Sequence, residues 1–101
     1  MNKERINVRL PEATLKAVEQ LHPEATRTQI IENALRQLLK DLHHDVYPAE
    51  FTATLLQRDA VRTKRKMCNL RIDRQYIEYI RLNQYNLTTC ITTALKLYVL
   101  P

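Results

Sequence analysis

The sequence predicts a mostly α-helical fold that contains one short two-stranded antiparallel β-ribbon. A segment in which polar and apolar residues alternate occurs twice, as RINVRLP at 5–11 and MCNLRID at 67–73. Each copy is followed by two segments whose apolar residues recur at helical spacing. A strand of about seven residues needs a partner for its backbone groups and cover for its apolar face. We therefore expect the two strands to pair, with four helices packed beneath them.

Composition bounds the size of the fold and the class of partner. The 101 residues form one small domain or two very small units, and 16 Lys and Arg against 11 Asp and Glu give a net charge of +5. An excess of positive charge favours a polyanionic partner such as nucleic acid. No apolar run approaches the roughly 20 residues of a membrane helix, and MNKERINVR is unlike a signal peptide. We expect no membrane partner and a cytoplasmic location.

Glycine is absent from the chain, which excludes several classes of site. Phosphate-binding loops, dinucleotide fingerprints and nucleophile elbows all need a residue that tolerates positive φ or close backbone approach. Turns must use Pro23, Pro48 and asparagines such as Asn83 and Asn86 instead, because asparagine enters the left-handed region more readily than most residues.

The first copy reads as strand, helix, helix. Pro11 ends the strand and is favoured in the first turn of a helix, so it also opens the next element. That helix is expected to stop near His22 and Pro23. Thr26 can cap the following helix while Gln29 reaches back to complete a capping box. The apolar positions of the three elements are, in order, Ile6, Val8 and Leu10; Leu15, Val18 and Leu21; and Ile30, Ile31, Ala34, Leu35, Leu38, Leu39 and Leu42.

The second copy repeats this pattern at an offset of 62 residues in the strand and first helix, and of 60 in the second helix. Asn86 and Thr88 then stand where Thr26 and Thr28 stand in the first copy. The apolar matches are Cys68, Leu70, Ile72, Ile77, Ile80, Ile91, Ala94, Leu95, Tyr98 and Val99. Agreement of burial pattern, caps and polar strand positions is stronger evidence for a repeat than any single match.

The polar half of the alternation forms the outer face of the ribbon. The major groove of DNA, about 12 Å wide, admits a two-stranded ribbon, and arginine and asparagine suit bidentate contacts with guanine and adenine. A solvated charged face is the alternative interpretation. The six outward residues are Arg5, Asn7, Arg9, Met67, Asn69 and Arg71.

INVRLP, a short helix and then TRTQIIENAL resemble the ribbon-helix-helix (Arc/MetJ) superfamily of prokaryotic DNA-binding proteins. The resemblance covers residues 4–42 and, less closely, 66–99. It implies base contacts from the six outward strand residues, among which Met67 departs from the usual polar choice. It also implies phosphate contacts at the start of each second helix, from Thr26, Thr28, Asn86 and Thr88. Two copies in tandem resemble the TraY-type proteins of conjugative plasmids, in which one chain supplies both halves of the fold as a pseudo-dimer.

The expected organisation is a first ribbon-helix-helix unit at 1–42, a partly helical linker at 43–65 and a second unit at 66–101. After Pro48, residues 49–62 suggest a short amphipathic helix with Phe51, Leu55 and Leu56 on one side. This spacer is long enough for an intrachain ribbon. Pairing of like strands from two chains is the open alternative, and it would favour inverted repeats in the DNA.

The run RTKRK at 62–66 is either a charged linker or a phosphate-contacting arm. Its position directly before the second strand makes Lys64, Arg65 and Lys66 candidates for phosphate contacts.

The cysteines and histidines give no clear cofactor signal. Cys68 and Cys90 occupy the positions of Ile6 and Ile30, so we interpret them as small buried hydrophobic residues. His43 and His44, flanked by two aspartates, could hold a metal ion but are more typical of a solvated helix end. We expect no cofactor and no metal.

The sequence therefore predicts a non-enzymatic protein that binds double-stranded DNA specifically, with further chains side by side on longer sites. Transcriptional repression is the expected role, and an accessory DNA-shaping factor in plasmid transfer or segregation is the alternative. An antitoxin-like interaction module is an alternative of another class. Because the chain ends at Pro101 directly after the last expected helix, only the spacer could serve such a module.

Overall fold

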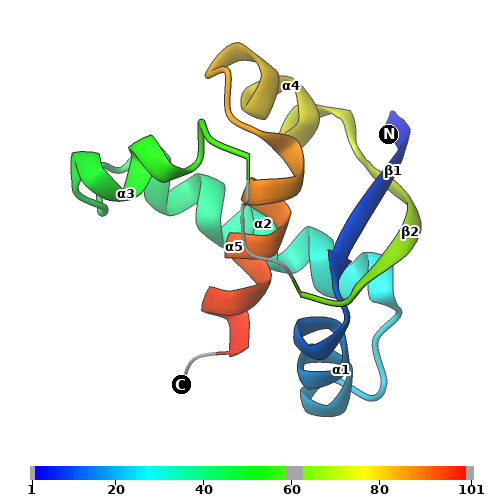
Figure 1. The fold of residues 1–101 in the computed structure, drawn as a ribbon. Helices are drawn as coiled ribbons and strands as arrows, with labels where there is room; N and C mark the ends of the chain where they lie inside the picture. Colours follow the sequence, from blue (N-terminus) through cyan, green and yellow to red (C-terminus); the bar gives the residue numbers. More distant parts are fainter. Residues whose placement is uncertain (1, 59–62, 100–101) are drawn as a thin grey trace.

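The computed structural model describes residues 2–58 and 63–99 (Figure 1). The elements follow the order strand, two helices, a short helix, strand, two helices. Their bounds are β1 (Lys3–Pro11), α1 (Glu12–Leu21), α2 (Arg27–His43), α3 (Ala49–Thr54), β2 (Arg65–Asp73), α4 (Arg74–Leu82) and α5 (Leu87–Val99).

The two strands of the chain pair with each other in an antiparallel ribbon, as the sequence predicts. Asn7 stands opposite Asn69 at the middle of the register. Arg5 stands opposite Arg71 on one side of this pair, and Arg9 opposite Met67 on the other. Residues that correspond in the two copies therefore lie on opposite sides of a point between the two asparagines.

The predicted division of the ribbon into an apolar and a polar face is confirmed. The inward side chains are buried and belong to one hydrophobic core to which both copies contribute. On the ribbon these side chains are Ile6, Val8, Leu10, Cys68, Leu70 and Ile72.

The helices cover the apolar face of the ribbon. α2 and α5 pack against each other, α1 packs on α5, and α4 contacts both α2 and α5. Because α1 follows β1 and α4 follows β2, these two helices lie at opposite ends of the ribbon (Figure 1). All seven expected apolar positions of α2 are buried.

Both predicted helix caps are present. The hydroxyl oxygen of Thr26 accepts a hydrogen bond from the Gln29 backbone N–H at 3.2 Å, and the Gln29 side chain accepts one from the Thr26 N–H at 2.9 Å. At α5, the Asn86 side-chain oxygen accepts a bond from the Thr89 N–H at 3.0 Å. These bonds satisfy amide groups that a helix N-terminus otherwise leaves unpaired.

The prediction that asparagines take the left-handed backbone conformation at turns is wrong. Among the described residues, those with positive φ are Asp45, at 53°, and Gln84, at 58°. Asn83 instead ends α4 with a φ of −88°, and its side chain donates a hydrogen bond to the Tyr79 carbonyl at 2.8 Å. Because Asn83 is held at the helix end, the residue after it makes the turn.

Two apolar residues do not lie where their spacing predicts. Leu21 is 56 % exposed at the end of α1, so the core side of that helix consists of Leu15 and Val18. In the spacer, α3 is only six residues long. Leu55 follows it and is fully buried, whereas Leu56 is 52 % exposed. The expected amphipathic helix does not continue through residues 55–57, which form a turn and a bend, and residues 59–62 lie outside the described residues.

Within the described ranges 2–58 and 63–99, none of the helices has the length and apolar character required to cross a membrane.

Candidate nucleic-acid interface

The outer face of the ribbon carries all six side chains that the sequence assigns to base contacts. Each of them is exposed, because each alternates with a buried residue on its strand. A shallow hollow of about 510 Å³ lies over this face and is lined by Arg5, Asn7, Asn69, Leu70 and Arg71. Guanidinium and amide groups with hydrogen-bond donors thus meet at one exposed surface.

The guanidinium groups of Arg5, Arg9 and Arg71 make no hydrogen bond or ion pair to any side chain or backbone group among the described residues. Their donors therefore face solvent and are available to an external ligand. Arginine presents these donors in a planar fork that matches the acceptors of guanine and of phosphate.

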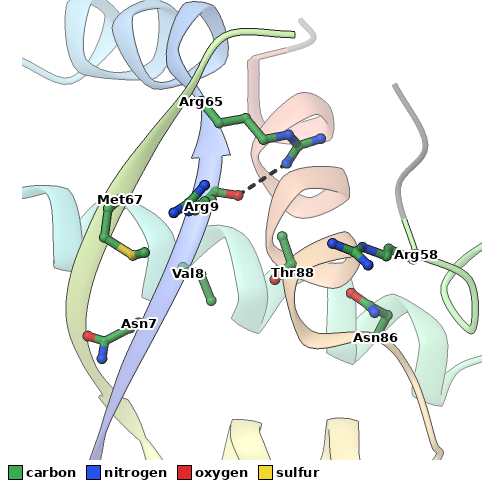
Figure 2. Close-up of a pocket in the computed structure, with 8 residues that line it drawn as sticks. All are labelled: Asn7, Val8, Arg9, Arg58, Arg65, Met67, Asn86 and Thr88. Carbon is green, nitrogen blue, oxygen red and sulfur yellow. Dashed lines mark hydrogen bonds between the residues drawn. The ribbon is translucent and has the colours of Figure 1, made fainter. Parts of the chain in front are cut away.

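A second hollow, of about 420 Å³, joins one end of the ribbon to the start of α5 (Figure 2). Its lining combines residues assigned from the sequence to bases with others assigned to phosphate. The full lining is Asn7, Val8, Arg9, Arg58, Arg65, Met67, Asn86 and Thr88. The structure therefore brings Asn86 and Thr88 next to the end of the ribbon at which Arg65 begins β2.

Arg65 is placed by the ribbon itself. Its backbone lies opposite Pro11 at the end of the register, and its side chain donates a hydrogen bond to the Arg9 carbonyl at 3.1 Å (Figure 2). This bond carries the Arg65 guanidinium across the ribbon end and toward the second hollow.

The other residues assigned to phosphate line neither hollow. Thr26 is exposed at the start of α2 and is engaged in its capping box, and Thr28 is partly exposed in the first turn. Lys64 reaches the Glu12 carboxylate at 3.9 Å, a separation typical of a weak surface ion pair. Lys66 is exposed, but it lies opposite the buried Leu10 and alternates in phase with the buried residues of β2, not with the six outward residues.

Arg58 is the residue of this surface that the sequence reasoning missed. It lines the second hollow from the spacer side, close to Asn86 (Figure 2). The sequence signal near it is Leu55, an apolar residue three positions earlier that is fully buried and whose carbonyl accepts a hydrogen bond from the Asn86 N–H. The spacing of Arg58 itself follows neither a strand nor a helix pattern.

The cysteines are buried as predicted. Burial raises the pKa of the Cys90 thiol to about 12. Cys68 accepts a long hydrogen bond from Arg27, at 3.8 Å between Nη1 and Sγ. In the part of the chain that the structure describes, no group of three or more His, Cys, Asp or Glu is arranged to hold a metal ion.

No family model, curated protein or solved structure matches the chain.

Proposed function

We propose that this protein binds double-stranded DNA with sequence specificity by inserting its β-ribbon into the major groove. The observation that carries the proposal is the cross-strand arrangement of the outer face. Two asparagines stand opposite each other at its centre, and Arg5 and Arg71 form the adjoining pair. In this interpretation one chain supplies a pseudo-dimer of two ribbon-helix-helix units and acts in the cytoplasm without catalysis.

The dimensions of the ribbon support this mode of binding. Paired strands lie about 4.8 Å apart, so two strands with their outward side chains suit a groove about 12 Å wide. A bidentate contact of arginine with guanine, or of asparagine with adenine, would contribute about 1 to 3 kcal/mol of discrimination between bases. Phosphate contacts at the ribbon flanks would then fix its register on the duplex.

We place the biological role in transcriptional repression, because a small protein that occupies a specific site can block access to it. An antitoxin-like role would need the spacer to bind another protein. The buried Leu55 side chain weighs against this role, since the spacer residue best suited to an apolar contact already packs in the protein's own core.

The test is in vitro selection from random duplex DNA at about 0.15 M salt, an ionic strength at which weak nonspecific contacts are largely screened. We expect a short asymmetric motif to be enriched, because the ribbon itself is unsymmetrical. An enriched inverted repeat would support base reading but favour dimers of like repeats.

A double variant on the ribbon and a control variant away from it make the test specific. The double variant Arg9→Ala and Arg71→Ala should lose enrichment, whereas Lys40→Ala, which removes an exposed charge from the last turn of α2, should retain it. Salt-dependent retention of all sequences alike by the unmodified protein would contradict the proposal.

A further inference from the structure

We propose, on the basis of the DNA-binding function above, that the two ends of the ribbon hold DNA unequally. Arg58, which comes from the spacer between the two copies, binds a backbone phosphate at the Arg9–Met67 end. This contact gives the protein a fixed direction on the duplex.

Arg58 is held in place by its neighbours in the chain. The Leu55 side chain is fully buried in the core, and the Leu55 carbonyl accepts a hydrogen bond from the Asn86 N–H at 2.6 Å. The Thr89 hydroxyl donates a bond to the Gln57 carbonyl at 2.7 Å. The residues just before Arg58 are thus fastened to the first turn of α5, which keeps its guanidinium beside the ribbon.

The surroundings of Arg58 suit a phosphate group. Among the described residues, those that line the 420 Å³ hollow include three arginines, Arg58, Arg9 and Arg65, and no carboxylate. It lies beside the start of α5, where the aligned backbone amides favour an anion. Arg58 is exposed and forms no hydrogen bond or ion pair with the described residues, so its donors are available.

The opposite end of the ribbon is richer in carboxylates, whereas at the Arg9–Met67 end Glu12 faces two lysines, Lys16 at 3.8 Å and Lys64 at 3.9 Å. At the opposite end Lys3 is paired with Glu32 at 2.9 Å, and the second oxygen of Glu32 accepts a hydrogen bond from the Asp73 N–H. Glu4 is paired with Arg81. These contacts neutralise cations at that end, and the carboxylates themselves repel phosphate.

The start of α2 is also less cationic than its sequence suggests. Arg27, in its first turn, forms a two-nitrogen contact with the Glu19 carboxylate, with Nη2 at 2.9 Å and Nε at 3.1 Å. The corresponding position in α5 is Leu87, and the cation near that helix comes from Arg58. The two helix starts that flank the ribbon therefore differ in what they offer to DNA.

The first experiment measures the salt dependence of binding to the duplex enriched in the selection, with Arg58→Gln and Lys40→Gln as a matched pair. Each variant removes one exposed positive charge. Losing one phosphate contact reduces the slope of log K against log salt by about 0.9, and we expect this for Arg58→Gln alone. Arg58→Lys should retain the slope, because it keeps the charge.

The second experiment is ethylation interference on both strands of the same duplex. With the unmodified protein, ethylated phosphates should interfere more strongly at one flank of the motif. Arg58→Gln should lose interference at that flank and keep the rest of the pattern. Thermal unfolding of Arg58→Gln should match that of the unmodified protein, since the side chain is exposed.

The outcomes separate the two proposals. If Arg58→Gln leaves the slope and the interference pattern unchanged while the motif is still bound, the inference about Arg58 is overturned and the DNA-reading function stands. Equal interference at both flanks with the unmodified protein would overturn the proposal that the two ends of the ribbon bind DNA unequally. If no duplex is enriched at all, the DNA-reading function falls, and this inference falls with it.

Discussion

The ribbon arginines differ from several helix arginines in what they bind within the protein. Arg27 binds Glu19, Arg81 binds Glu4, and Arg36 donates to the Tyr76 hydroxyl at 2.9 Å. The guanidinium groups of Arg5, Arg9 and Arg71 have no such partner among the described residues. A binding surface needs this difference, because an arginine committed to a neighbouring carboxylate must break that pair before it contacts a base.

Arg9→Ala and Arg71→Ala should each weaken binding to the selected duplex by about 1 to 3 kcal/mol and relax the preference at one base pair. The physical reason is loss of a bidentate contact with a base edge. Titration of the selected duplex and of its single-base variants measures both effects. Lys64→Ala should lower affinity for all sequences nearly equally, and a uniform loss for the two arginine variants would assign them to phosphate instead.

Cys90 should make stability sensitive to alkaline pH. Burial raises the pKa of its thiol from 9.0 to about 12, so between these values the unfolded chain releases a proton that the folded chain retains. The stabilising contribution is complete below pH 9 and is lost as the pH rises toward 12. The free energy of unfolding should therefore fall by up to about 1.4 kcal/mol per pH unit in this window.

The variant Cys90→Ala isolates this effect, because the tyrosines and lysines that also titrate there are unchanged. Denaturant unfolding at several pH values should give a shallower decline for Cys90→Ala than for the unmodified protein. Parallel declines would show that the thiol is not the cause.

At the scale of elements, the spacer is part of the folded core. Leu55→Ala should lower the free energy of unfolding by about 2 to 5 kcal/mol, the usual cost of truncating a buried leucine. Leu56→Ala is the matched control, since Leu56 is 52 % exposed, and it should change stability by no more than about 0.5 kcal/mol. Chemical denaturation measures both, and equal small effects would show that the spacer is not packed.

Periodicity and caps predict the ribbon, α2 and the start of α5, because each has a local cause in the sequence. The alternation places Asn7 and Asn69 outward, and the Thr26 capping box begins α2. Arg58 could not be found in this way. Its position depends on hydrogen bonds of the spacer with Asn86 and Thr89, which are about 30 residues further along the chain. Leu21 fits its helical pattern yet is exposed, because α1 ends there.

At the scale of the whole molecule, two separate features break the approximate symmetry of the ribbon. Met67 stands at the position that corresponds to Arg5, so the outer faces of the two strands differ at this position. Arg58 and the carboxylates around Glu32 affect the flanks. Sequence preference and direction of binding should therefore be separable by mutation.

Met67→Arg should make the preferred DNA motif more symmetric, because both strands would then present Arg, Asn and Arg outward and operator symmetry mirrors protein symmetry. The change is compatible with the fold, since Met67 is 50 % exposed and the Arg5–Arg71 pair already places two arginines opposite each other. Selection with Met67→Arg should enrich an inverted repeat whose centre faces the point between Asn7 and Asn69. Met67→Leu should retain the asymmetric motif. The stronger phosphate interference at one flank should persist in Met67→Arg, because Arg58 is unchanged. An unchanged asymmetric motif would show that the residue at position 67 does not read a base.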